Sequence, residues 1–202
     1  MSSDLPTTTT LLEGLFDPHN QTVWETFHER YRPIILAVAR RIGLGAEDAA
    51  DVAQETLVRF FQEYRAGKYN RERGRLRSWI VAIARYRIAD IARAKARRRE
   101  WRGESVLAFV EDEDRLTSLW DEECRREVLR RAMNELNETT LLDERTITAF
   151  KRQAFEERTP AEIADELGMN IDAVYKARQR CLAQLRTILL RLNAAYELSD
   201  GG

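Results

Sequence analysis

Residues 158–186 read RTPAEIADELGMNIDAVYKARQRCLAQLR and predict a short helix, a turn and a longer helix. Thr159, with Glu162 three residues later, forms the pattern of a capping box at the start of the short helix. Gly168 then ends that helix, and Asn170 can cap the longer one. This order is typical of a helix-turn-helix unit, and an ordinary helical hairpin is the alternative.

The longer helix directs several polar side chains away from its apolar face. With Val174 facing inward, a rotation of about 100° per residue turns four neighbours outward. These are Tyr175, Lys176, Gln179 and Arg180. Because the second helix of such a unit lies in the major groove, we predict that these four contact DNA. Arg178 is expected to lie along the surface of the domain instead.

Apolar residues at steps of three and four predict helices along the rest of the chain. In the second half the expected helices are 121–136, 142–156, 160–167 and 171–191. In the first half they cover about 24–42, 49–64 and a segment from 76 onward, with a short helical turn at 11–16. Pro33 is expected to kink or break the first of the long helices. The sequence therefore predicts an all-α fold.

The helix expected after Gly45 carries an acidic ridge opposite its apolar stripe. The acidic ridge consists of Asp48, Asp51, Glu55 and Gln62. Such a surface repels DNA and suits a protein partner that presents Arg or Lys. The alternative is a solvated face, with the acids near the helix start stabilised by the helix dipole.

A strongly basic segment, residues 71–102, follows the acidic ridge. It holds twelve Arg or Lys against three acidic residues, a net charge of +9 in a chain whose total is −1. Because most of these cations are arginines interleaved with aromatic residues, nucleic acid is favoured as the partner over a solvated helix face. Arg87 and Asp90 fall on the apolar stripe of this segment and are expected to pair with each other. Trp79, on the same stripe, is expected in the core.

An acidic segment separates the two halves of the chain. Residues 104–127 hold nine acidic residues against three arginines, and the helical period lapses there. We therefore expect two small helical domains joined by an acidic linker. The predicted organisation is an N-terminal extension 1–20, a first domain 21–99, a linker 100–120, a second domain 121–192 and a C-terminal tail 193–202.

Several classes of protein are not supported by the sequence. No run of about 18 apolar residues occurs, so membrane insertion is not expected, and the N-terminus lacks the pattern of a secretory signal. Cys124 and Cys181 form no CxxC pair and are expected to be reduced thiols. His19 and His28 lie in no spacing that would bind a metal. We expect no cofactor, no metal and no catalytic activity.

Two parts of the chain resemble conserved regions of bacterial sigma factors. The first part resembles the second conserved region of these factors. It consists of residues 46–61, AEDAADVAQETLVRFF, followed by residues 74–99, GRLRSWIVAIARYRIADIARAKARRR. The fourth region resembles residues 158–186. Both occur in order around an acidic linker, and nothing resembles the first or third region. The chain is therefore similar to the small extracytoplasmic-function (ECF) sigma factors, over about 21–99 and 125–190.

The resemblance implies a bacterial cytoplasmic protein that binds core RNA polymerase, directs it to promoters and helps to melt them. The implied contacts with the polymerase, whose largest and second-largest subunits would be the partners, are Asp48, Asp51, Gln54 and Glu55. The implied contacts with the minus-ten element are Tyr69, Asn70, Arg71, Arg73, Arg75, Arg77, Tyr86, Arg93 and Arg97. Tyr175, Lys176, Gln179 and Arg180 are implied to read the minus-thirty-five element, and the acidic linker to thread a basic channel.

Some residues depart from the family pattern. Many relatives have Asn at the position of Tyr86 and basic residues at those of Tyr175 and Ala177, which implies an altered promoter sequence. An anti-sigma factor is a further partner that the resemblance allows. The alternative function is a conventional helix-turn-helix regulator that binds operator DNA as a dimer, although no heptad seam lies outside the domain cores. A helical adaptor that binds only proteins would leave the basic segment without a role.

Overall fold

The computed structural model describes residues 8–17, 19–70, 72, 74–98, 101–138 and 142–197, with backbone alone for 101–104. All regular secondary structure in these ranges is helical, which confirms the predicted all-α fold. Contacts divide the chain into two compact units, one covering Thr8–Glu127 and the other containing Val128–Gly202. None of the helices in the described ranges is both long and apolar enough to cross a bilayer.

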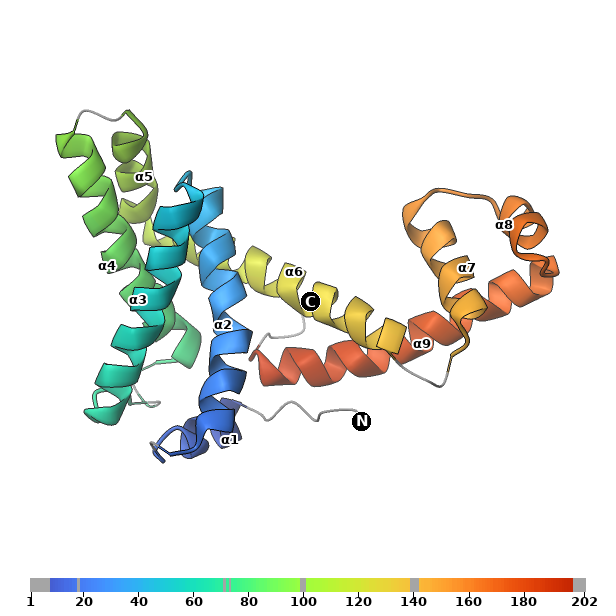
Figure 1. Ribbon diagram of the computed structural model, residues 1–202, viewed down its shortest axis with the longest axis horizontal. Helices are drawn as coiled ribbons and strands as arrows, with labels where there is room; N and C mark the ends of the chain where they lie inside the picture. Colours follow the sequence, from blue (N-terminus) through green and yellow to red (C-terminus); the bar gives the residue numbers. More distant parts are fainter. Residues whose placement is uncertain are drawn as a thin grey trace. The chain divides into compact units, whose positions relative to one another are not determined.

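The first unit is a bundle of helices that follow one another along the chain. They are α1 (Thr8–Gly14), α2 (Gln21–Arg41), α3 (Ala46–Arg65), α4 (Leu76–Arg97), α5 (Trp101–Glu111) and the beginning of α6 (Glu113–Glu138). Helix α2 packs against α3, α3 against α4, and α4 against α5, so that neighbours in sequence lie side by side (Figure 1).

Aromatic side chains form the centre of this bundle. The Phe60 side chain is fully buried, and its ring stacks on Phe27 with 4.4 Å between centroids. Trp79 of α4 meets Phe60 edge-on at 5.1 Å. Aromatic pairs in these geometries stabilise a core beyond the area that they bury. Trp79 is half-buried, so it packs against this core without being enclosed in it.

The short N-terminal helix α1 docks on the bundle, which confirms the expected helical turn. Leu11 and Leu15 are fully buried. The Tyr64 hydroxyl of α3 donates a hydrogen bond of 2.7 Å to the Leu12 carbonyl oxygen. Burial raises the pKa of Tyr64 to about 12, because the charged phenolate would lose its hydration. The docked helix thus closes one end of the aromatic core.

Helix α2 continues through Pro33, so of the expected kink or break the break does not occur, and the kink stays a prediction. Proline removes one backbone hydrogen bond, but the helix buries large side chains such as Tyr31, Ile34 and Ile35 on both sides of it. The helix ends at Arg41, and Gly43 follows two residues later with a φ of 106°, which is costly for any residue with a Cβ.

The acidic segment predicted as a linker, residues 100–120, is helical over most of its described part. It contains α5 and the first turns of α6, and Val106, Val110, Leu116 and Trp120 are buried. These apolar residues are spaced four to six positions apart among the acids, so the segment covers the bundle while it exposes most of its charges. The division by contacts falls after Glu127. The domain boundaries themselves stay a prediction.

The second unit is built on a long C-terminal helix. It contains the end of α6, α7 (Glu144–Phe155), α8 (Pro160–Leu167) and α9 (Ile171–Ala195), close to the predicted helices. The capping box is confirmed: Thr159 Oγ1 accepts from the Glu162 N–H, and the Glu162 carboxylate accepts from the Thr159 N–H at 2.8 Å. Gly168 has a left-handed φ of 60°, and the Asn170 side chain caps α9.

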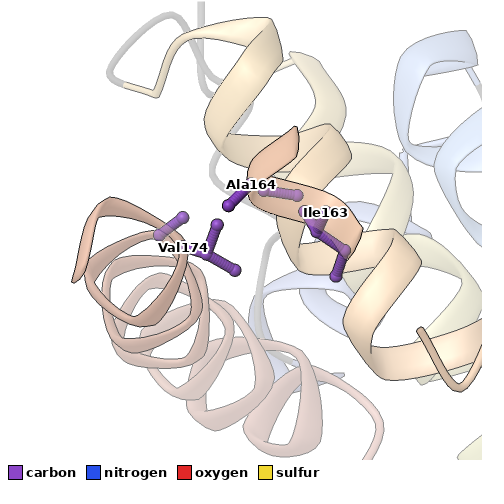
Figure 2. Packing of buried hydrophobic residues seen from close by; sticks show 5 residues of the cluster. Ile163, Ala164 and Val174 are labelled. Carbon is purple, nitrogen blue, oxygen red and sulfur yellow. The ribbon is translucent and has the colours of Figure 1, made fainter. Parts of the chain in front are cut away.

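A small apolar cluster holds α7, α8 and α9 together. It comprises the buried residues Ala149, Ile163, Ala164, Val174 and Ala177, with Leu167 and Met169 packed against it. Figure 2 shows the side chains of Ile163 and Ala164 on one side and Val174 on the other, facing a common interior. With Val174 fixed inward, the rotation of α9 about its axis is also fixed.

Candidate nucleic-acid and protein interfaces

Two residues of the acidic ridge are already held in ion pairs with α4. Lys95 Nζ lies 2.5 Å from Asp48 Oδ2. Arg87 Nη2 lies 2.6 Å from Glu55 Oε1. Both pairs connect α3 with α4, so the folded unit neutralises part of a surface that looked uniformly acidic in sequence.

The centre of the predicted polymerase contact remains accessible. Asp51 and Gln54 are exposed on α3, between the paired residues Asp48 and Glu55. Among the described residues, Asp51 takes part in no ion pair. A partner with an Arg or Lys side chain would therefore meet Asp51 without displacing an internal cation.

The predicted pairing of Arg87 with Asp90 is wrong. Arg87 reaches across to Glu55 on α3, and Asp90 is exposed and pairs with Arg93 at 2.9 Å. The sequence placed both charges on one buried stripe, but Asp90 lies at its edge in solvent. Arg93, predicted to contact DNA, is more than half exposed, and Asp90 is its one acidic partner among the described residues.

Other cations of α4 also have acidic partners within the unit. Arg77 Nη1 lies 2.5 Å from Asp121 Oδ1, and Arg85 Nη1 lies 2.8 Å from Glu113 Oε2. Arg77 belongs to the first turn of α4 and not to the preceding loop, and three quarters of its side chain is buried. Arg97 and Arg98, at the end of α4, are exposed. The basic segment is therefore compensated along much of α4 and more open at its C-terminal end.

The loop before α4 contains five of the predicted minus-ten residues, from Tyr69 to Arg75. Tyr69 is half-buried and stacks on Trp79, with centroids 5.1 Å apart and planes 19° apart. The Asn70 side chain accepts from the Glu72 N–H at 2.8 Å, which fixes the loop locally. Arg75 is exposed at the start of α4. Arg71 and Arg73 lie outside the described residues.

A groove of about 630 Å³ runs between α3 and α4. Tyr86 stands on it with 68% of its surface exposed, the highest value among the large hydrophobic residues that are exposed. Its wall also includes Trp79, Ile83 and the Arg87–Glu55 ion pair. An exposed tyrosine ring next to an apolar wall offers a face on which a planar group can stack.

The helix-turn-helix unit exposes the four side chains predicted from its sequence. Tyr175, Lys176, Gln179 and Arg180 are all exposed, while Val174 and Ala177 are buried. Arg178 is exposed as well. The first turns of α9 therefore present aromatic, amide and cationic groups, the set of side chains that contact base edges and phosphates.

A hollow of about 620 Å³ lies beside these turns and brings in a residue that sequence reasoning missed. Lys176 and Arg180 line it from α9, and Arg145 and Asp143 from the start of α7. The cap at Asn170 was a local signal for where α9 begins. No pattern in the sequence indicated that the two helix starts would be neighbours.

The two cysteines and the possible metal ligands were further candidates for chemistry in the described part of the chain. Cys124 and Cys181 are buried free thiols. Burial raises the pKa of Cys124 to about 12 and that of Cys181 to about 11, which disfavours the thiolate. Within the described residues, no three His, Cys, Asp or Glu side chains form a group that could hold a metal ion.

Comparison with known protein families gives a match in the first unit. Residues 27–99 match the family model described as Sigma-70 region 2. This range covers most of α2, all of α3 and α4, and the loop between them. No curated protein matches the chain. The match supports a sigma-70 family factor, with a role in RNA polymerase binding and promoter melting.

Proposed function

We propose that this protein is an ECF-type sigma factor that binds core RNA polymerase in the bacterial cytoplasm and directs it to two-part promoters. The observation that carries the proposal is the family match at residues 27–99, combined with a capped helix-turn-helix unit later in the same chain. The first feature supports polymerase binding and melting. The second supplies a separate reader of double-stranded DNA.

In this proposal the acidic ridge binds a basic helical hairpin of the largest polymerase subunit. Asp51 and Gln54 support this role because they are exposed at the centre of α3. Asp48 and Glu55 would join the contact by exchanging Lys95 and Arg87 for cations of the polymerase. Because such an exchange replaces one ion pair by another, its net cost in free energy is small.

The groove between α3 and α4 would receive the non-template strand of the minus-ten element. An unstacked base on the face of Tyr86 would gain about 1–3 kcal/mol, the range typical of base–aromatic stacking. Arg93 and Arg97 lie seven and eleven residues further along the same helix and would contact phosphates. Tyr69, Asn70 and Arg75 are proposed to border this contact from the loop, with Arg71 and Arg73.

The second unit would read the minus-thirty-five element through Tyr175, Lys176, Gln179 and Arg180. Their exposure on the first turns of α9 supports this assignment. The acidic segment 100–120 is proposed to follow the polymerase channel in the complex. Since Val106 and Val110 are buried against the first unit, that path would require α5 to leave its present position.

Co-elution with sigma-free core RNA polymerase on a sizing column tests the proposal. The parent chain should co-elute with the polymerase. The Asp51→Arg variant should not, because the new arginine would repel the basic side chains of the polymerase hairpin. Glu25→Arg on α2 is the matched control, since it makes the same charge change at an exposed site outside the acidic ridge. If the folded parent fails to bind its cognate polymerase, the sigma-factor proposal is wrong and a dimeric regulator takes its place.

A further inference from the structure

The second unit sorts its basic side chains into two groups. Arg152 and Arg158 both pair with Glu166, and Arg191 Nη2 lies 2.5 Å from Glu135. Arg145, Lys176 and Arg180 are exposed and take part in no ion pair among the described residues. The first group holds helices together, whereas the second group keeps its charge available for a partner.

These three cations line one hollow, whereas Arg178 and Arg186, which are also exposed and in no ion pair among the described residues, do not line it. Lys176 and Arg180 are four residues apart on α9 and so share a face of that helix, and Arg145 borders the same hollow from α7. The small residues Ala173 and Ala177 form part of its wall, so a bulky anion can approach the backbone closely. The shape and charge fit a phosphate group that lies beside the first turns of α9.

One carboxylate lines the hollow, and its charge is already engaged. Asp143 caps α7 by accepting hydrogen bonds of 2.8 Å from the Thr146 N–H and from the Thr146 hydroxyl. These bonds turn the carboxylate toward the positive end of the helix dipole. They also fix the first turn of α7, which positions Arg145. The hollow as a whole therefore favours an anion.

We propose that Arg145 contacts the DNA backbone and forms, with Lys176 and Arg180, a phosphate-binding hollow of the helix-turn-helix unit. Arg145 lies outside α9, so it would bind the strand that borders the groove occupied by that helix. Such a contact sets the position of α9 on the duplex and carries no base preference. The inference rests on the proposed function only in naming double-stranded DNA as the ligand.

Binding of the full chain to a fluorescent 30-base-pair duplex, followed by anisotropy between 50 and 200 mM NaCl, tests this inference. The variants are Arg145→Ala, Arg145→Lys and Lys176→Ala. Arg186→Ala is the matched control, because this residue is an exposed arginine of α9 that does not line the hollow. Two duplexes of unrelated sequence are compared, and circular dichroism verifies that each variant is folded.

Arg145→Ala should weaken binding about fivefold or more on both duplexes, the effect of losing one charge-assisted hydrogen bond. It should also lower the slope of log K against log salt by about 0.9, as for one phosphate contact. Arg145→Lys should restore most of the slope, and the control should match the parent. An Arg145→Ala variant that keeps the affinity and slope of the parent overturns the inference, as does a parent chain that binds neither duplex. Polymerase co-elution does not depend on Arg145, so failure of the proposed function is observed separately.

Discussion

The ion pair between Arg77 and Asp121 should stabilise the first unit, and the Arg77→Ala substitution should reveal this. The two side chains connect the first turn of α4 with α6, with 2.5 Å between Nη1 and Oδ1. About a quarter of the Arg77 side chain and a fifth of the Asp121 side chain remain exposed. The sequence resemblance instead assigned Arg77 to DNA, so the substitution separates a structural role from a binding role.

The expected magnitude follows from the burial of the pair. Two unit charges about 4 Å apart attract by about 4 kcal/mol at an effective dielectric constant of 20. Desolvation and side-chain ordering offset most of this, and a fully exposed pair contributes only about 0–1 kcal/mol. For a pair that is three quarters buried, we expect Arg77→Ala to lower the free energy of unfolding by about 1–3 kcal/mol. The coupling energy in a double-mutant cycle with Asp121→Ala should be about 1–2 kcal/mol.

Tryptophan fluorescence during urea unfolding measures this effect in the first unit alone. All four tryptophans precede Val128, where the division by contacts falls, and Trp120 is buried next to Asp121. The comparison needs the parent, the two single variants and the double variant. Exchange of the two residues, Arg77→Asp with Asp121→Arg, should recover part of the lost stability because it restores an ion pair.

Two results would contradict this reasoning. Additive effects of the two single substitutions would mean that the side chains do not interact in the folded protein. An Arg77→Ala variant with the unfolding midpoint of the parent, but with weaker promoter binding in the polymerase complex, would mean that Arg77 serves DNA and not the fold.

Three further predictions concern stability and reactivity. Phe60→Ala should lower the free energy of unfolding by about 3–5 kcal/mol, because it opens a cavity among stacked rings; urea unfolding checks this, and a loss below about 1 kcal/mol would contradict it. Hydrogen bonds from Thr146 lower the pKa of Asp143, so the folded state binds this proton less tightly than the unfolded state. Its contribution to stability is present above about pH 4 and is lost as pH falls through the folded pKa, which Asp143→Asn should abolish in acid titrations followed by circular dichroism. Cys124 and Cys181 should react with a thiol reagent at pH 8 only after unfolding, and rapid labelling of the native chain would refute their burial.

Much of the second unit could be predicted from the sequence, because its signals are local. The capping box at Thr159, the glycine at 168 and the cap at Asn170 each involve groups within a few residues of one another. The 3.6-residue period then fixed which side of α9 is buried, and with it the exposure of Tyr175 and Lys176. Interactions of this range depend little on the rest of the fold.

Composition was a poorer guide in the acidic segment. Its many carboxylates predicted a linker between 100 and 120, which stays a prediction, but they gave no sign that Val106 and Val110 bury an apolar edge of α5. At Pro33, where a kink or a break was expected, the helix does not break, for a related reason. In both places, burial of a few apolar side chains outweighed a local feature that disfavours a helix, the many carboxylates in one case and the proline in the other. The average composition of a segment does not show which of its side chains are buried.

Helical periodicity and caps in the sequence determined where the helices run and which face of each is apolar. Only the tertiary structure decided which charges meet, because Arg87 and Glu55 are 32 residues apart, and Arg77 and Asp121 are 44 residues apart. The 3.6-residue spacing of apolar residues predicts on which side of its own helix a side chain lies. It does not predict which other helix packs against that side. The position of Arg145 beside α9 has the same origin, since it depends on how α7 packs across the apolar cluster of the second unit.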